Sequence, residues 1–498
     1  MRASASSILA FVCLAPAALF GGSARTSYEE ARPVLDAGIK AMGGLEALQA
    51  VKDVRRIGAG TGYNLGQSLR PDAPLTTRTM EVTSLHDFAG GRSATETVNV
   101  PTGGVTTKVR AVLSGDSGFG YSLVTKVLTP STPAGVAAAK AALRRDPAAL
   151  LLTARARGET LRSLGDETID GKPHHVITFA DGDGTQIGLY FEAASGLLAK
   201  VDTLADDPVL GDAVTENVLS DYRDVAVGSA RVRLPARVVT RLAGQVTQDL
   251  RYSVIEVNTG ARDDAFAAPP GAQTIPPAAA AGVTITKLGD GAYFASGGSH
   301  NSLFVVFDDH VVVVEGPLNE TRSLALMARI AETAPGKPIK YVVPTHYHFD
   351  HSGGLRTFMA RGVTVVTTPG NKAFVERLAA TPHTIRPDSL SRAPRPPVVE
   401  TFTGKRVFTD GTRILEVIDI GPNPHVAEAV VGYLPREKVV FVSDLFTIPP
   451  EGPYPPAGPA LGEFSERIKS LAVEKIAPGH GRIGTMEDLK AALAVRAP

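Results

Sequence analysis

The sequence predicts two domains: an N-terminal α+β domain rich in antiparallel sheet, and a C-terminal α/β domain in which strands alternate with helices. Three observations support this fold class. The 498 residues are too many for one ordinary hydrophobic core. Short segments that alternate apolar and polar residues recur through the first half of the chain. A stretch rich in Pro, Ala and Gly, residues 269–282, then predicts a linker between residues 25–268 and residues 283–498.

The first residues are typical of a secretory signal peptide. Arg2 precedes an apolar run from Ile8 to Phe20, which small residues up to Ala24 follow. We therefore expect residues 1–24 to be a signal peptide and the mature protein to be periplasmic or secreted. No later stretch is long and apolar enough for a membrane span, so we expect no transmembrane helix in the mature chain. The single cysteine, Cys13, lies in this segment, so a metal site in the mature chain must use His and acidic side chains.

The N-terminal half is expected to hold two helical regions and many strands. Tyr28–Met42 predicts a helix that ends at Gly43, and Val136–Gly158 predicts a helical region with a break near Asp146 and Pro147. The clearest hairpin joins His174–Ala180 to Thr185–Glu192. Further strands are expected at Thr79–Leu85, Ala94–Val100, Thr106–Leu113, Lys200–Leu204, Thr215–Tyr222, Arg237–Arg241 and Gln248–Val257.

The N-terminal half shows no catalytic constellation. His174 and His175 are adjacent on a predicted strand, so they point to opposite faces and are interpreted, like the isolated His86, as structural. The strand pattern and the closing phrase Asp264–Pro269 resemble the curved half-barrels of periplasmic lipid-carrier and lipoprotein-sorting proteins. This resemblance implies a ligand-binding role for the N-terminal domain as one alternative.

The C-terminal half alternates strands and helices. The all-valine run Val311–Val314 predicts a strand buried on both faces. Helices are expected at Asn319–Thr333, Asn371–Ala380 and Phe464–Lys475, and after Thr485, which can form a capping box with Asp488. Strands are expected at Val283–Lys287, Ala292–Ala295, Leu303–Phe307, Val311–Glu315, Tyr341–Val343, Val363–Thr367, Arg413–Ile420, Glu428–Leu434, Val439–Ser443 and Ile476–Pro478.

The densest group of chemically active side chains follows the strand Tyr341–Val343. His346, His348, Asp350 and His351 fall within six positions, in a loop that leads into a helix. Neutral imidazole and carboxylate are ligands that suit zinc, and four such side chains rarely crowd one turn without an ion. The motif therefore predicts a metal site.

Three more ligand-type residues each follow a predicted strand: His425, Asp444 and His480. Each alone would be unremarkable, since a single Asp after a strand is usually a turn residue and a single His is usually structural. Strand ends gather at one edge of a sandwich, so these residues and the motif can converge there.

In this ordered set, residues 283–498 resemble the metallo-β-lactamase-fold hydrolases. The resemblance implies a four-layer αββα sandwich with two Zn²⁺ at one edge; iron or manganese are alternatives. It implies that His346, His348 and His425 hold one ion, that Asp350, His351 and His480 hold the other, and that Asp444 bridges them.

Glu315 departs from the family pattern, which usually has Asp at this position behind the ligands. The phrase Glu315–Glu320 with Lys337–Tyr341 resembles an uncharacterised subgroup of secreted bacterial members. Glu315 either orients a ligand histidine or caps the neighbouring helix.

The family pattern implies hydrolysis of an ester, lactone, thioester or amide by a hydroxide shared between two metal ions, with Asp350 orienting the nucleophile or taking its proton. His300 and Tyr347 are further candidates for substrate contact or for orienting the ligands, although a surface or packing role is equally open. The proline-rich residues 449–456 are expected to form a pocket wall.

Other functions share parts of this evidence. A mononuclear iron dioxygenase on the same fold, a true β-lactamase, and a ligand-binding protein are the alternatives. Lys and Arg number 51, as do Asp and Glu, so the chain has zero formal net charge. This balance argues against a nuclease or another nucleic-acid partner, and favours a small-molecule substrate.

Overall fold

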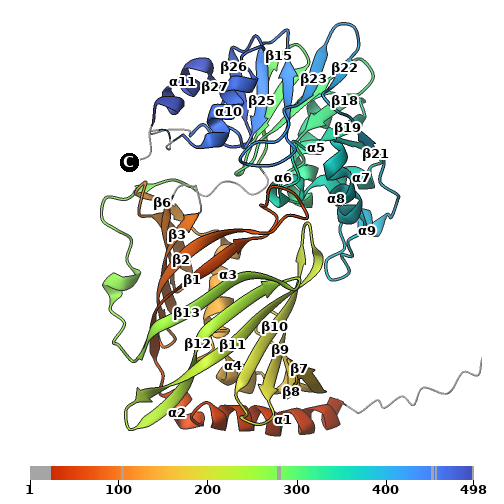
Figure 1. Cartoon of the computed structure of the whole chain (residues 1–498). Helices are drawn as coiled ribbons and strands as arrows, with labels where there is room; N and C mark the ends of the chain where they lie inside the picture. The colour runs from red at the N-terminus through yellow and green to blue at the C-terminus, as the bar shows by residue number, and fades with distance from the viewer. Residues whose placement is uncertain (1–23, 102–105, 277–281, 450–453, 455–456, 496–498) are drawn as a thin grey trace, which may run out of the picture.

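The computed structural model describes residues 24–101, 106–276, 282–449, 454 and 457–495. Of the predicted signal peptide it therefore describes only Ala24, and most of residues 449–456 also lie outside the described part. Figure 1 shows an N-terminal domain built on one large curved sheet, with a C-terminal sandwich packed against its upper end. Among the described residues, no helix combines the length and the apolar character needed to cross a membrane.

The N-terminal sheet has 14 strands, in the order β14-β6-β5-β4-β3-β2-β1-β13-β12-β11-β10-β9-β8-β7. Neighbouring strands are antiparallel except for the pair β14 and β6. The strands are β1 (Asp53–Asn64), β2 (Thr76–Asp87), β3 (Arg92–Pro101), β4 (Thr107–Ser114), β5 (Ser117–Ser122), β6 (Val127–Pro130), β7 (Arg162–Ile169), β8 (Lys172–Ala180), β9 (Gln186–Glu192), β10 (Leu198–Asp207), β11 (Gly211–Val227), β12 (Ala230–Leu242), β13 (Gln245–Val257) and β14 (Gln273–Thr274).

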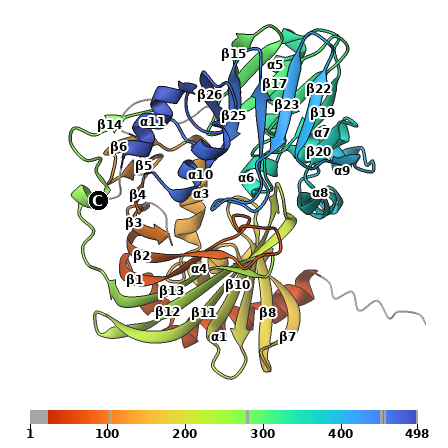
Figure 2. The ribbon, with the colours of Figure 1, turned by 45° about the horizontal axis from the view of Figure 1, so that its top comes forward.

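The helices of this domain are α1 (Ala24–Ala41), α2 (Leu45–Gln49), α3 (Pro133–Arg144) and α4 (Leu150–Ala156). Figure 2 shows the sheet curving around them. The predicted break at Asp146 and Pro147 separates α3 from α4. One core joins α1, α2 and α4 mainly to strands β8 to β12, with Leu35, Leu151 and Phe179 among its buried members. These helices leave the space beside α3 less densely filled, as described below.

The strand pattern concealed β1. Its residues include Gly58, Gly60 and Gly62, and glycine is disfavoured in strand interiors. Here the glycine at position 60 permits a close approach, because a Cβ atom there would lie 1.9 Å from the carbonyl oxygen of Asp249 on β13. Part of the predicted linker is also ordered, since Gln273 and Thr274 pair with β6 as β14.

The C-terminal domain contains two sheets with helices outside them. The first has the order β15-β16-β17-β18-β19-β20-β21, and the second runs from β22 to β27 in sequence order. The strands of the first sheet are β15 (Thr284–Gly289), β16 (Ala292–Ser296), β17 (Ser302–Val306), β18 (Val311–Val314), β19 (Ile339–Val343), β20 (Thr364–Thr367) and β21 (Val399–Thr401). Those of the second sheet are β22 (Lys405–Thr409), β23 (Ile414–Asp419), β24 (Val430–Leu434), β25 (Val439–Ser443), β26 (Lys475–Pro478) and β27 (Gly484–Thr485).

A core that includes Leu303, Val314, Val417 and Phe441 joins the two sheets. The helices are α5 (Glu320–Thr333), α6 (Phe349–Ser352), α7 (Leu355–Ala360), α8 (Pro369–Ala380), α9 (Ser389–Arg392), α10 (Pro459–Arg467) and α11 (Met486–Ala494). The predicted αββα sandwich is therefore confirmed.

Two local predictions in this domain had different outcomes. Thr485 and Asp488 form the predicted capping box at the start of α11. The predicted helix Phe464–Lys475 was wrong in its bounds, because α10 begins at Pro459 and ends at Arg467. Proline is favoured in a first helical turn, and Lys475 already belongs to β26.

Candidate metal centre

The seven predicted metal ligands gather at one edge of the sandwich. His346 and His348 follow β19, and Asp350 and His351 belong to α6. The other three follow β23, β25 and β26. Figure 1 places α6 where the sandwich faces the N-terminal domain. Parallel pairing of β18 with β19, and of β25 with β26, brings these strand ends to the same edge.

Four of these side chains form a first group, in which one ligand atom from each lies within 4.8 Å of the others: His346, His348, His425 and Asp444. The Nε2 atoms of His346 and His425 are 3.3 Å apart. His425 Nε2 is also 3.4 Å from Oδ2 of Asp444. The geometry thus brings together the three histidines expected to hold one ion, with Asp444 beside them.

A second group contains Asp350, His351 and His480, and also His300. Asp444 connects the two groups, because its Oδ1 lies 2.9 Å from Nε2 of His351 and 2.9 Å from Nε2 of His480. His480 Nδ1 donates to the backbone carbonyl of Ser299 at 2.7 Å, which leaves Nε2 directed at the centre. The Asp444 carboxylate thus contacts side chains of both groups.

His300, predicted as a candidate for substrate contact, lies within the second ligand group itself. Its Nε2 is 3.2 Å from Oδ2 of Asp350, and its ring packs against the ring of His480 with centroids 4.2 Å apart. The side chain is buried. The sequence indicated only that it preceded a strand; its addition to the second group depends on how β16, β17 and β26 come together.

Several buried ligand atoms have no hydrogen-bond partner among the described residues. They are His348 Nδ1, His351 Nε2 and Asp444 Oδ1. The last two are only 2.9 Å apart, but their orientation does not form a hydrogen bond. Buried polar atoms normally have partners, since leaving one unsatisfied costs about 1–3 kcal/mol. Imidazole nitrogens and a carboxylate that converge without partners fit a divalent cation.

Glu315 lies directly behind these ligands. It is fully buried, and its Oε2 accepts a hydrogen bond from Nδ1 of His351 at 3.0 Å. Its Oε1 accepts from Ser443 Oγ at 2.9 Å and from the hydroxyl of Thr345. The neighbouring helix α5 is instead capped by Asn319. Of the two roles considered for Glu315, the contacts favour orientation of a ligand histidine.

Two residues of this hydrogen-bonded group have strained backbones. Glu315 has a φ of 77° and Ser443 a φ of 50°. Both values lie in the left-handed region of the backbone, which residues other than glycine rarely adopt. Such strain typically costs about 1–3 kcal/mol per residue and is concentrated at functional sites. Here it turns both side chains toward His351.

Electrostatics separate the histidines into two kinds. Burial, together with neighbouring histidines, lowers the pKa of His346 well below its usual value and that of His348 to about 4, so both are neutral, as metal ligands must be. Burial alone would also lower the pKa of His351, but Glu315 and Asp444 outweigh it and raise that pKa. Burial would raise the pKa of Asp444, yet His351 and the other histidines hold it well below its usual value.

The N-terminal domain also contributes to the centre, through the loop between β1 and β2. Gln67 Nε2 donates to Oδ1 of Asp350 at 2.7 Å. The backbone carbonyl of Ser68 accepts from Nε2 of His348 at 3.0 Å, which leaves the Nδ1 atom of that ring free to bind an ion. Neither residue could be predicted from the sequence, because nothing in it connects this loop with a motif some 280 residues later.

The loop is closely fitted to the sandwich. Gly66 has a φ of +72°, and a Cβ atom there would lie 2.3 Å from the ring of Phe349. The carbonyl of Leu69 accepts from the amide of Ala427 at 2.8 Å. The loop between β1 and β2 therefore contacts residues close in sequence to Asp350 on one side and to His425 on the other.

Two other residues have clear environments. The Tyr347 hydroxyl donates to the carbonyl of Ser68, and its ring packs against Phe374. Burial raises the pKa of this phenol to about 12, so the hydroxyl stays protonated at neutral pH. Of the roles considered for Tyr347, these contacts favour packing between the two domains over contact with a substrate. His383 is buried and contacts Asp206 of the N-terminal domain at 2.6 Å.

The C-terminal domain has matches among known proteins. Residues 295–480 match the family model described as metallo-beta-lactamase superfamily. Among solved structures, a metallo-beta-lactamase from Pontibacter korlensis is 24% identical, with a TM-score of 0.33, and the match covers 43% of this chain and 98% of that one. The metallo-beta-lactamase FIM-1 from Pseudomonas aeruginosa, in its mono-zinc form, is 19% identical, with a TM-score of 0.32, and the match covers 42% of this chain and 92% of that one.

Proposed function

We propose that the chain is a metal-dependent hydrolase that uses two Zn²⁺ ions to cleave an ester, lactone, thioester or amide. The match of residues 295–480 to the metallo-beta-lactamase superfamily model and the two groups of His and Asp side chains support this proposal. The observation that carries this proposal is the pair of ligand groups joined by Asp444. His346, His348 and His425 would hold one ion, and Asp350, His351 and His480 the other. We further propose that the protein acts in the periplasm or outside the cell, on the basis of its first 24 residues.

Bound zinc supplies a Lewis acid for the carbonyl oxygen and lowers the pKa of water toward about 7. The protein's own side chains would then orient the water nucleophile and the substrate. Asp350 is the most exposed carboxylate of the centre, with 35% of its side chain accessible, against 15% for Asp444. It is thus the carboxylate best placed to meet a water molecule or a substrate.

Both oxygens of Asp350 are held in place. Oδ1 accepts from Gln67, and Oδ2 lies 3.2 Å from His300 Nε2. Burial would raise the pKa of this carboxyl, but His300 and His351 hold it well below its usual value. Asp350 is therefore ionised at neutral pH, as a residue that orients a nucleophile or accepts its proton must be.

The test is metal analysis of the purified protein, coupled to a panel of ester, lactone, thioester, amide and β-lactam substrates. We expect two zinc ions per chain and turnover of at least one acyl substrate. One iron ion per chain with no hydrolysis would instead support a mononuclear oxygenase, and turnover confined to the β-lactam would support a β-lactamase.

Two variants test the assignment of residues. His348→Ala should remove zinc from the first group, and Asp350→Ala should lower kcat by about 10²–10⁴-fold, the usual contribution of a positioned acid or base. His175→Ala and Asp309→Ala are matched controls, because the His175 side chain is about half exposed, the Asp309 side chain is exposed, and neither residue belongs to the ligand groups. Normal zinc content and turnover in both test variants would contradict the proposal.

A further inference from the structure

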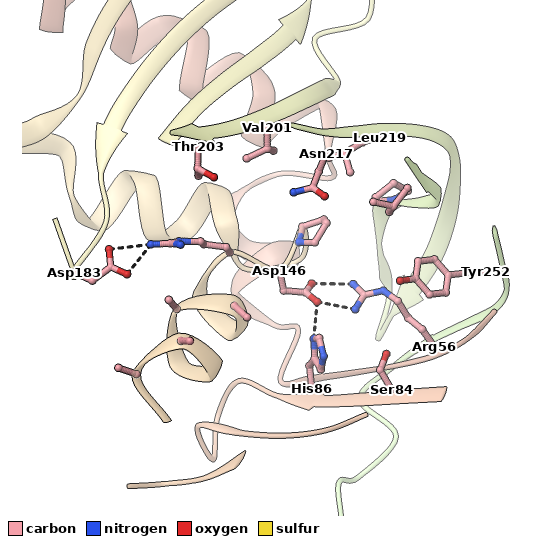
Figure 3. Close-up of a pocket in the computed structure, with 18 residues that line it drawn as sticks. Arg56, Ser84, His86, Asp146, Asp183, Val201, Thr203, Asn217, Leu219 and Tyr252 are labelled. Atoms are coloured by element: carbon pink, nitrogen blue, oxygen red, sulfur yellow. Dashed lines mark hydrogen bonds and ion pairs between the residues drawn. The ribbon is translucent and has the colours of Figure 1, made fainter. Parts of the chain in front are cut away.

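A cavity lies inside the N-terminal domain, apart from the metal centre. Figure 3 shows it between the curved sheet and helix α3, and its volume is about 600 Å³. None of the candidate metal ligands belongs to its lining. Cavities of about 300–1,000 Å³ are the size that proteins use for small-molecule ligands.

One face of α3 creates this space. Ala137, Ala138, Ala141 and Ala142 line the cavity, at the spacing that places them on one side of a helix. Leucine at these positions would fill the gap between helix and sheet. Three of the four alanines, at positions 137, 138 and 142, remain exposed although they face the sheet, so the cavity is accessible from outside.

The opposite wall is mostly apolar. Val201, Leu219, Pro235 and Val238 contribute from strands β10, β11 and β12. Val201 and Leu219 are only 7% and 5% exposed, so this wall lies inside the fold and not on its outer surface. An apolar lining interrupted by a few polar groups is typical of small-molecule sites. The apolar wall therefore indicates a ligand with an aliphatic or aromatic body.

A few polar groups interrupt the apolar lining. Figure 3 shows the hydroxyls of Ser84, Thr203 and Tyr252 around the cavity. None of the three makes a side-chain hydrogen bond with another described residue. Ser84 is also buried, with only 5% of its surface exposed. A buried hydroxyl such as that of Ser84 normally has a hydrogen-bond partner. Because these three hydroxyls have none within the part of the chain that the structure describes, they are available to the polar end of a ligand.

The charges at the cavity are already neutralised within the protein. Arg56 makes two hydrogen bonds to Asp146, at 2.7 and 2.8 Å, and His86 Nδ1 lies 2.7 Å from the same carboxylate (Figure 3). The other lining arginine, Arg145, contacts Asp183 at 2.7 Å. No arginine of the lining is left without a carboxylate, so a buried anionic ligand would have no cation of its own.

We propose that this cavity binds an uncharged amphipathic molecule, with an aliphatic or aromatic body and a hydroxyl, ester or amide group at one end. The apolar body lies against the alanine face of α3 and the wall of β10–β12, and the polar end meets the free hydroxyls. The site is independent of the metal centre and of the reaction proposed there.

Displacement of an uncharged fluorescent dye, Nile red, from the full-length protein tests this site. The competitor is 1-O-decylglycerol, whose ether bond a hydrolase does not cleave, used below its micelle concentration. We expect saturable binding of one dye per chain and full displacement by the competitor. Decanoate, which has the same chain length and a carboxylate, should compete at least about tenfold less well, because burial of an unpaired charge is costly.

Variants on α3 place the binding in this cavity. Ala138→Leu and Ala142→Leu should each weaken dye binding by at least about tenfold, since added side-chain volume competes with the ligand. Ala134→Leu is the matched control, because that residue is exposed on the same helix but does not line the cavity, and it should stay within about twofold. Tyr252→Phe removes only a hydroxyl and should reduce affinity for the ether lipid by about fivefold.

His348→Ala should bind the dye as well as the unmodified chain does, which separates this site from the metal centre. The proposal is overturned if the folded protein shows no saturable binding, or if both leucine variants bind like the control. Equal or better competition by decanoate would show that the ligand is anionic and that the charge argument is wrong.

Discussion

Replacement of Glu315 gives the sharpest test of how the metal centre is built. Its carboxylate accepts hydrogen bonds from His351, Ser443 and Thr345, and all four side chains are buried. Glu315→Ala would remove the acceptor of three buried donors, although the Thr345 hydroxyl also lies 3.0 Å from Nδ1 of His346 and the Ser443 hydroxyl 3.3 Å from Nδ1 of His351. At about 1–3 kcal/mol for each unsatisfied group, partly offset by entry of water, we expect a loss of about 3–5 kcal/mol in the free energy of unfolding of the metal-free protein.

Glu315→Gln separates charge from shape. The amide keeps one acceptor for His351, and the hydroxyls of Ser443 and Thr345 can rotate to accept from its nitrogen. We therefore expect a stability loss of only about 1–2 kcal/mol. Zinc affinity should still fall by about 10–100-fold, the usual effect of losing a carboxylate that orients a ligand histidine.

Urea unfolding of the metal-free protein measures the first quantity, and zinc competition against a chelating dye measures the second. Glu463→Gln is the matched control, because Glu463 is half exposed on α10 and, among the residues that the structure describes, pairs with Arg467 alone. Zinc affinity within twofold of the unmodified protein for both the Ala and the Gln variants would refute the orienting role.

Three further predictions concern the N-terminal domain. Gln67→Ala should lower kcat/KM only about fivefold, because water can replace its hydrogen bond to the partly exposed Asp350. Gln67→Glu should lower kcat/KM about 100-fold, because its carboxylate repels that of Asp350. Equal effects of the two variants would argue against this contact. Gly66→Ala should reduce activity and destabilise the protein by about 1–3 kcal/mol, seen by thermal unfolding, since its φ is +72° and an aromatic ring occupies the Cβ position. Burial would raise the pKa of Asp146, but Arg56 and His86 outweigh this and hold it well below its ordinary value, so the stabilisation is present above about pH 4 and is lost as pH falls further. Asp146→Asn should therefore unfold at lower urea concentration at pH 7 and show a smaller stability loss between pH 5 and pH 3, and an unchanged pH profile would contradict the assignment.

Much of the C-terminal half could be predicted from the sequence because its signals are local. The strand Val311–Val314 was predicted from four consecutive valines, and the start of α11 from a capping box. The ligand motif was equally clear, since four ligand-type side chains occupy six positions. The end of α10 was missed because apolar residues continue past Arg467 without a helix-breaking residue.

The sequence by itself determined the ligand types, their order along the chain and the sheet-rich character of both halves. These depend on side-chain chemistry and on hydrophobic periodicity within a few residues. Only the tertiary structure decided that Glu315 faces His351, that His300 joins the second ligand group, and that Gln67 and Ser68 of the N-terminal domain contact Asp350 and His348. The first two depend on how the strands and loops of the C-terminal domain come together. The contacts of Gln67 and Ser68 join residues up to 283 positions apart and are fixed by the packing of the two domains, which no local pattern encodes.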